Sequence, residues 1–277
     1  MRTGGAPSLI FGFFAASLAL APAALAQKVT RKPPTAEDWA ALAKLPDFTG
    51  VWEVGMGGPP RGAAPPAGAP AGRAGARARG FGRGPAPSLT PAYAAKAEAE
   101  RKAAAGRESE TANCLPPGMP GIMTQPYPME FLLTPGQVTI VIEAYSQVRH
   151  IYTDGRPLPA DPDPNFYGTS VGHWEGDTLV AETIGFEQTA RGLSFPFSDK
   201  LKIVERFHLT DADTMSIETT VIDPEALTMP YSMGTRTLRR HRNWTIAEYI
   251  CEENNRNSAD AQGKAGINLA NPEASPK

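Results

Sequence analysis

Histidines, and carboxylates placed among apolar residues, are the side chains here that could move protons near neutral pH. His150 and His173 lie in strand-like segments, and Glu182 and Glu205 alternate with apolar residues. Because successive side chains of a strand point to opposite faces, each glutamate would share a face with its apolar neighbours. Burial raises the pKa of a carboxyl group, so either could act as general acid or base. We take His173, Glu205 and His150 as candidate catalytic residues.

Period-two alternation assigns these groups to three faces that we expect to point into the protein. The faces are Leu201, Ile203, Glu205 and Phe207; Val180, Glu182 and Ile184; and Val148, His150 and Tyr152. A structural interpretation stays open for each of them. Arg149 or Arg206 could hold Glu205 in an ion pair, and either histidine could be a half-buried, hydrogen-bonded residue.

Further candidate ligand contacts lie next to these groups. Trp174 follows His173, Tyr152 lies in the same strand-like segment as His150, and Arg149 and Glu182 complete the set. Arg156 opens a long loop, residues 154–169, where its guanidinium could bind a carboxylate or phosphate through two hydrogen bonds. The alternative is that Asp154, Gly155 and Arg156 only form a turn.

The sequence does not predict a metal or cofactor site. Its four histidines, at positions 150, 173, 208 and 241, are widely spaced, and no His-Glu-x-x-His or Cys-x-x-Cys spacing occurs. Neither a phosphate-binding loop nor a dinucleotide fingerprint is present. We expect no cofactor and no metal.

Short alternating segments joined by tight turns must position the candidate residues. We expect strands at residues 48–54, 129–133, 138–143, 147–152, 170–174, 178–184, 201–209, 214–222, 235–239 and 244–251. The connections at residues 134–137, 175–177 and 210–213 are short, which favours antiparallel neighbours. The fold class is therefore all-β: an antiparallel up-and-down, lipocalin-like barrel or a rolled sandwich.

The chain divides by composition into six parts. Residues 1–26 have the three regions of a cleaved secretory signal peptide, and residues 27–54 carry a short helix at 35–44 and the first strand. Residues 55–91 form a Gly, Pro, Ala and Arg insertion that we expect to be disordered. A surface helix and linker (92–112), the main β domain (113–257) and a disordered tail (258–277) follow.

Charge and cysteine content restrict compartment and partners. Without Arg2, the chain carries 26 basic residues of the 27 against 29 acidic ones, a formal charge of −3, so nucleic acid is not an expected partner. No later segment is apolar enough to span a membrane. Cys114 and Cys251 are expected to form one disulfide, and a periplasmic or extracellular location follows.

Two resemblances add to these expectations. Phe48-Thr49-Gly50-Val51-Trp52 resembles the Gly-x-Trp signature of lipocalin-like barrels, whose Trp closes one end of the barrel. From Asn113 onward the chain is similar to a family of secreted bacterial proteins without an assigned activity. That resemblance lies in Asn113-Cys114-Leu115-Pro116-Pro117-Gly118-Met119-Pro120, Ile151-Tyr152-Thr153-Asp154-Gly155-Arg156-Pro157, Gly172-His173-Trp174-Glu175-Gly176-Asp177-Thr178-Leu179-Val180, Val204-Glu205-Arg206-Phe207 and Glu248-Tyr249-Ile250-Cys251-Glu252-Glu253-Asn254.

Three functions are compatible with these features. The first is a barrel that binds a small, partly apolar molecule in its lumen. The second is a cofactor-free lyase, isomerase or hydrolase that uses a His and Glu pair. The third is an envelope interaction protein that makes contact through the Arg-bearing insertion. The His and Glu pair requires both groups on the same side of the barrel wall.

Overall fold

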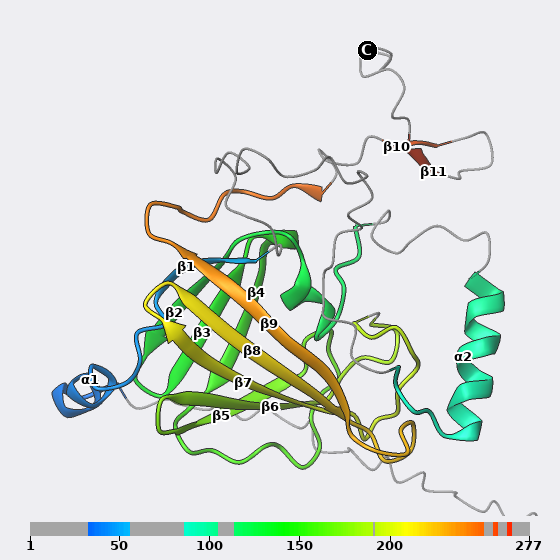
Figure 1. Cartoon of the computed structure of the whole chain (residues 1–277), viewed down its shortest axis with the longest axis horizontal. Coiled ribbons are helices and arrows are strands. Elements are labelled where there is room, and N and C mark those ends of the chain that lie inside the picture. The colour runs from blue at the N-terminus through cyan, green and yellow to red at the C-terminus, as the bar shows by residue number, and fades with distance from the viewer. Residues whose placement is uncertain are drawn as a thin grey trace, which may run out of the picture. The chain divides into compact units, whose positions relative to one another are not determined.

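The computed structural model describes residues 33–55, 86–104, 114–190, 192–251, 257–259 and 265–267. Nine of its strands form a closed barrel in sequence order (Figure 1), as the sequence predicts. These are β1 (Gly50–Val54), β2 (Met129–Thr134), β3 (Gln137–Ile142), β4 (Gln147–Tyr152), β5 (Thr169–Glu175), β6 (Thr178–Ile184), β7 (Lys202–Asp211), β8 (Thr214–Ile222) and β9 (Tyr231–His241).

One seam of the barrel is parallel, which the sequence-based expectation of a purely antiparallel meander did not include. Ile151 of β4 pairs with Ser170 of β5 in parallel register, whereas every other neighbouring pair of these strands, including β1 with β9, is antiparallel. A closed ring of nine strands cannot alternate direction throughout, so an odd number of seams must be parallel. The long connection between β4 and β5 makes this one possible.

Tight turns set the register of the hairpins. Gly136 and Gly176 adopt positive φ values of 75° and 62°, a conformation that glycine adopts without steric cost. Gly176 lies between Glu175 and Thr178, which pair across β5 and β6. The predicted turns at 134–137 and 175–177 are therefore confirmed.

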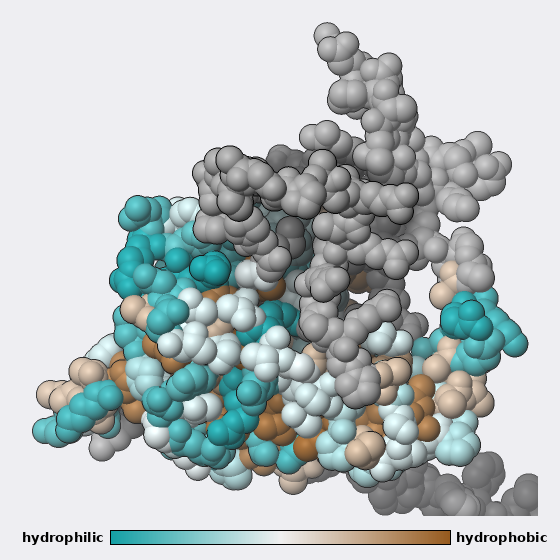
Figure 2. Space-filling model, in the orientation of Figure 1, coloured by the Kyte–Doolittle hydropathy of each residue, from teal (hydrophilic) through white to brown (hydrophobic). Residues whose placement is uncertain are grey.

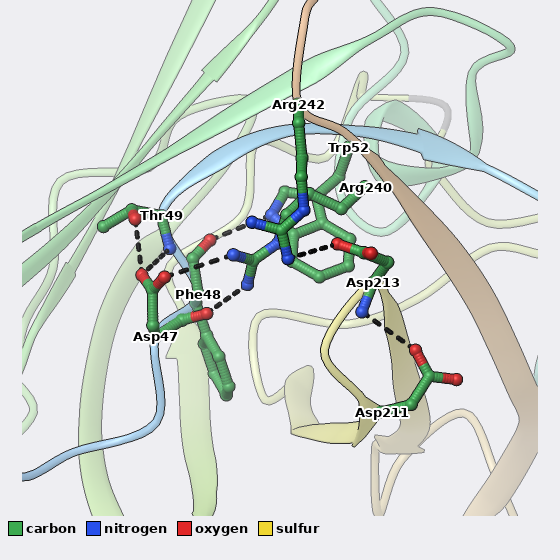
Figure 3. A network of polar contacts seen from close by, with 8 residues as sticks. All are labelled: Asp47, Phe48, Thr49, Trp52, Asp211, Asp213, Arg240 and Arg242. Atoms are coloured by element: carbon green, nitrogen blue, oxygen red, sulfur yellow. Dashed lines mark hydrogen bonds and ion pairs between the residues drawn. The ribbon is translucent and has the colours of Figure 1, made fainter.

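Aromatic residues close one end of the barrel, which we call the Phe48 end. The ring centroids of Trp52 and Phe131 are 6.5 Å apart, those of Phe131 and Phe207 are 6.2 Å apart, and Phe48 lies 5.2 Å from Trp174. The Trp52 indole N–H donates to the Phe48 carbonyl at 2.9 Å, and Arg240 lies over the Trp52 ring (Figure 3). Trp52 is therefore part of the buried aromatic cluster at this end.

An irregular segment covers the opposite end, where β2 and β5 begin. This plug, residues 118–124, includes the 3₁₀ helix η2 (Gly121–Thr124). Its Met119, Ile122 and Met123 are each at most 2% exposed. The loop between β6 and β7 packs against the same core with three buried aromatic residues, Phe186, Phe195 and Phe197. The barrel interior thus has an aromatic end and a plug end.

The two predicted helices lie outside the barrel core. Helix α1 (Ala36–Leu42) begins at a capping box in which Asp38 and Thr35 bond reciprocally, and helix α2 (Pro91–Ala104) buries no residue. The residues just before α2 contact the segment after β8, although the insertion was expected to be disordered up to residue 91. Leu89 forms a bridge with Leu227, and the Thr90 N–H donates to the Ala226 carbonyl.

The last predicted strand, residues 244–251, is not a strand. This segment instead crosses toward the 3₁₀ helix η3 (Ala144–Ser146), where Tyr249 packs against Tyr127 and Tyr145. The predicted disulfide is present at its end, with Cys114 and Cys251 Cα atoms 5.7 Å apart. A short pair, β10 (Asn257–Ala259) and β11 (Ala265–Ile267), occupies part of the predicted disordered tail.

Several sequence predictions lie outside the described residues. They concern the signal peptide at 1–26 and the insertion between residues 56 and 85. No helix among the described residues is long and apolar enough to cross a membrane.

Candidate functional site

Polar side chains point into the barrel from six consecutive strands. Burial and the register of the strands identify one such residue on each of these strands toward the plug end, and we call this set the inner polar arc. Its members are Arg149 (β4), Ser170 (β5), Thr183 (β6), Glu205 (β7), Thr219 (β8) and Arg236 (β9).

Strand pairing explains why these residues meet. Ser170 pairs with Thr183 across β5 and β6, and Glu205 pairs with Thr219 across β7 and β8. Residues directly opposite each other in neighbouring strands share a face, so each pair points inward together. Arg149 has a side chain long enough to reach across β5 and β6 to these groups.

Arg149 is the centre of the arc. Its Nη2 donates to a Glu205 carboxylate oxygen at 2.5 Å and to the Thr183 hydroxyl at 3.1 Å, and its Nε donates to the Ser170 hydroxyl at 3.4 Å. The Arg149 and Glu205 side chains are only 2% and 1% exposed. A buried ion pair of this kind is tolerated because hydrogen bonds satisfy the remaining polar atoms.

One nitrogen of the arc does not follow that rule. The Arg149 Nη1 atom is buried, yet no described protein atom accepts a hydrogen bond from it. Buried polar groups in native proteins nearly always have a partner, and an unmet donor costs about 1–3 kcal/mol. Tyr167 Oη, Arg240 Nε and His241 Nε2 are also buried without a hydrogen-bond partner among the described residues, but Arg149 Nη1 is the one that belongs to the inner polar arc.

Arg236 brings a second guanidinium to the arc. Its Nη1 donates to the Met123 carbonyl of the plug at 2.9 Å. Burial lowers the pKa of Arg236 to about 10, although attraction by Glu205 acts in the opposite direction. The arc consequently contains two guanidinium groups and a single carboxylate.

The rest of the barrel wall is apolar. Strands β1 to β3 point Trp52, Met129, Phe131, Ile140 and Ile142 inward, all of them at most 1% exposed. The interior therefore has a polar side and an apolar side. Such a division suits a molecule with one polar group and an apolar remainder.

The structural interpretation of Glu205 is confirmed, because Glu205 points inward and Arg149 holds it in an ion pair. Arg206 does not; it lies on the outer face and pairs with Glu175 at 2.9 Å. The predicted inward face of β7, with Leu201, Ile203 and Phe207, is also confirmed.

The face predicted for β4 is wrong. Arg149 and Ile151 are buried, whereas Val148 and His150 are exposed and Tyr152 is half-buried. The His150 Nδ1 lies 3.0 Å from the Gln137 side-chain nitrogen on the outer surface. Val148 and Tyr152 made that face look apolar in the sequence. In the structure Arg149 points inward instead, and its ion pair with Glu205 offsets the cost of burying its charge.

Arg156 is also on the outside, where its role as a ligand contact remains a prediction. Its guanidinium stacks 4.0 Å from the centre of the Tyr152 ring and pairs with Asp154 at 2.6 Å. The Asp154 hydrogen bonds outweigh desolvation and raise the pKa of Arg156. These contacts fit the turn interpretation of residues 154–156.

His173 and Glu182 lie on the outer face as well. His173 is in register with Val180, which is in register with Arg206, so His173 and Glu205 are on opposite sides of the wall. The His173 Nε2 lies 3.1 Å from Glu175. Glu182 pairs with Lys202, because Leu179, Ala181 and Thr183 form the inward face of β6. Trp174 points inward but packs against Phe48.

Sequence reasoning missed Ser170, Thr183, Thr219 and Arg236. A signal was present for three of them, since Thr183, Thr219 and Arg236 are each separated by one residue from a buried apolar position of the same strand. Single polar residues within an apolar alternation cannot be assigned to a face until the phase of the strand is known.

Outside the inner polar arc, the buried polar residues in the described part of the chain are Ser198 and Asp223. The visible face of the barrel carries mainly hydrophilic and neutral residues with scattered apolar ones (Figure 2). Within the described residues, no three His, Cys, Asp or Glu side chains are grouped so that they could hold a metal ion. No protein family matches this chain, and no curated protein matches it.

Proposed function

We propose that the protein binds a small, partly apolar molecule inside the barrel, between the inner polar arc and the apolar wall of β1 to β3. One observation carries the proposal: Arg149 Nη1 is buried in the arc without an acceptor. A ligand atom there would complete the hydrogen bonds of the guanidinium group. The apolar wall would receive the rest of the molecule.

The aromatic packing of the Phe48 end directs the ligand toward the plug end. Arg149 is only 3% exposed, so the ligand reaches the arc only when the plug or a neighbouring loop moves aside. The Arg236 bond to the Met123 carbonyl joins the arc directly to the plug. We therefore expect slow association compared with an open cleft.

A fluorescence titration with the neutral apolar dye N-phenyl-1-naphthylamine tests this function. We expect the dye to brighten on binding and Thr183→Leu to weaken binding, because the larger side chain would occupy the arc. Glu182→Leu, next to it but on the outer face, is the matched control and should leave binding unchanged. If both variants bind the dye equally, the interior is not the site.

We also propose that the protein is periplasmic or extracellular. The disulfide between Cys114 and Cys251 supports this, since disulfides persist in oxidising compartments. The resemblance to a family of secreted bacterial proteins points the same way. Envelope contact through the Arg-bearing insertion remains a prediction, because residues 56–85 lie outside the described part of the chain.

A further inference from the structure

The donors of Arg149 indicate what kind of group the ligand presents. A guanidinium has five N–H donors and accepts nothing. The Ser170 and Thr183 hydroxyls and the Glu205 carboxylate engage only its Nε and Nη2. What is missing at Nη1 is therefore a hydrogen-bond acceptor rather than a donor.

The charge of the inner polar arc indicates the sign of that acceptor. The buried Arg149 and the half-buried Arg236 provide two positive charges, and Glu205 is the one carboxylate of the arc. Asp223 is the other buried carboxylate in the described residues. Its oxygens already accept from Ser198 N and Oγ and from the Glu225 and Ala226 N–H groups, at 2.7 to 3.1 Å.

Glu205 offsets the charge of Arg149, and the half-buried Arg236 adds a second guanidinium to the arc. An anionic oxygen at Arg149 Nη1 would satisfy the open donor and be attracted by both guanidinium groups. Hydrogen bonds between a guanidinium and an anionic oxygen are also roughly twice as strong as neutral ones. A neutral carbonyl or alcohol would satisfy only the donor.

We propose that the ligand carries a carboxylate that binds Arg149 Nη1, with its apolar part against β1 to β3. This inference rests on the proposed function, since it names the chemical class of the molecule bound in the same interior. The Arg149 side chain on β4 holds the carboxylate, and the positive charge of Arg236 on β9 stabilises it. The ligand class is thus an apolar carboxylic acid in its ionised form.

Matched acid and neutral compounds test the inference at neutral pH by displacing N-phenyl-1-naphthylamine. The pairs are decanoate with 1-decanol and benzoate with benzamide, so that chain and ring shapes are both represented. We expect at least one acid to bind about tenfold or more tightly than its neutral partner. Equal displacement within both pairs would overturn the carboxylate inference while leaving the proposed function intact.

Variants of the inner polar arc test whether Arg149 is the group that makes acids bind more tightly than their neutral partners. In the double variant Arg149→Gln, Glu205→Gln, which leaves no unpaired buried charge from the ion pair, the acid preference should disappear while the dye still binds. Arg206→Gln removes an arginine from the outer face of β7 and should keep the preference. If the double variant retains it, Arg149 is not the binding group and the inference fails.

Glu205→Gln alone should change the affinity for acids in the opposite direction to the double variant. Removing the carboxylate that occupies Arg149 Nη2 raises the positive charge of the arc, so acids should bind more tightly than to the wild type. Weaker acid binding in a folded Glu205→Gln protein would contradict the inference. If the dye binds neither the wild type nor this variant, the proposed function itself fails, and the carboxylate inference with it.

Discussion

At the residue scale, the ion pair between Arg149 and Glu205 dominates the interior. Arg149→Leu leaves the Glu205 carboxylate buried and unpaired, which should lower the free energy of unfolding by about 3–5 kcal/mol. The double variant Arg149→Gln, Glu205→Gln should recover most of that loss. Chemical denaturation measures both. Lys202→Gln, which breaks the exposed pair with Glu182, is the control and should cost less than about 1 kcal/mol.

The Asp47 carboxyl should make the stability of the folded protein depend on pH in the acidic range. Desolvation raises the pKa of its carboxyl, but hydrogen bonds from Thr49 and Arg240 outweigh this and hold the pKa below its ordinary value of 3.8 (Figure 3). Because the folded pKa is depressed, its contribution is present above pH 3.8 and is lost as pH falls through the folded value.

Asp47→Asn should therefore reduce stability at neutral pH and flatten its decline in acid, as measured by melting temperature against pH. Thr49→Val removes one of the bonds to Asp47 and should give part of the same change. An unchanged acid profile in Asp47→Asn would show that this carboxyl does not contribute to the decline.

At the element scale, the disulfide should hold the plug. Cys114 lies just before the plug, and Cys251 is 137 residues away in sequence. Cys114→Ser with Cys251→Ser should lower stability by up to about 4–5 kcal/mol on a chain-entropy estimate. Hydrogen exchange should accelerate at the Met119 and Ile122 amides, which bond to Phe166 and Gly118, but not in β7 and β8. Uniform acceleration would mean that the plug does not open separately.

The contact between the plug and the loop after β6 should tolerate no side chain at Gly192. A Cβ atom there would lie 1.9 Å from the Met119 carbonyl oxygen, so the backbone must shift. Gly192→Ala should cost about 1–3 kcal/mol. At Gly155 a Cβ would meet nothing within 4 Å. Gly155→Ala should therefore lower stability by only about 1 kcal/mol, which is the cost of holding alanine in the left-handed backbone conformation of this residue. Equal melting temperatures would contradict this account of the packing.

At the scale of the whole molecule, the barrel was predictable because its signals are local. Alternation in β7 and β8 and the glycine turns at Gly136 and Gly176 each depend on a few adjacent residues. The parallel seam between β4 and β5 was not predictable in this way, since it follows from the number of strands in the closed ring.

The inward-pointing polar residues were harder to predict, because their positions depend on contacts between residues that are far apart in the sequence. Glu205 was placed correctly because Ile203 and Phe207 flank it on an unambiguous strand. His150 and Tyr152 were placed on the wrong face because Arg149 becomes acceptable inside only beside Glu205, 56 residues later. An ion pair of this separation leaves no periodic pattern in the sequence.

The most direct test of ligand binding inside the barrel is the ¹⁵N side-chain spectrum of the arginines, recorded while decanoate is added. If decanoate binds inside the barrel, the Arg149 Nε resonance shifts with saturation, Arg236 responds with it, and Arg206 on the outer face does not move. A titration that shifts Arg206 while Arg149 stays fixed, or that leaves all three unchanged, would contradict binding inside the barrel.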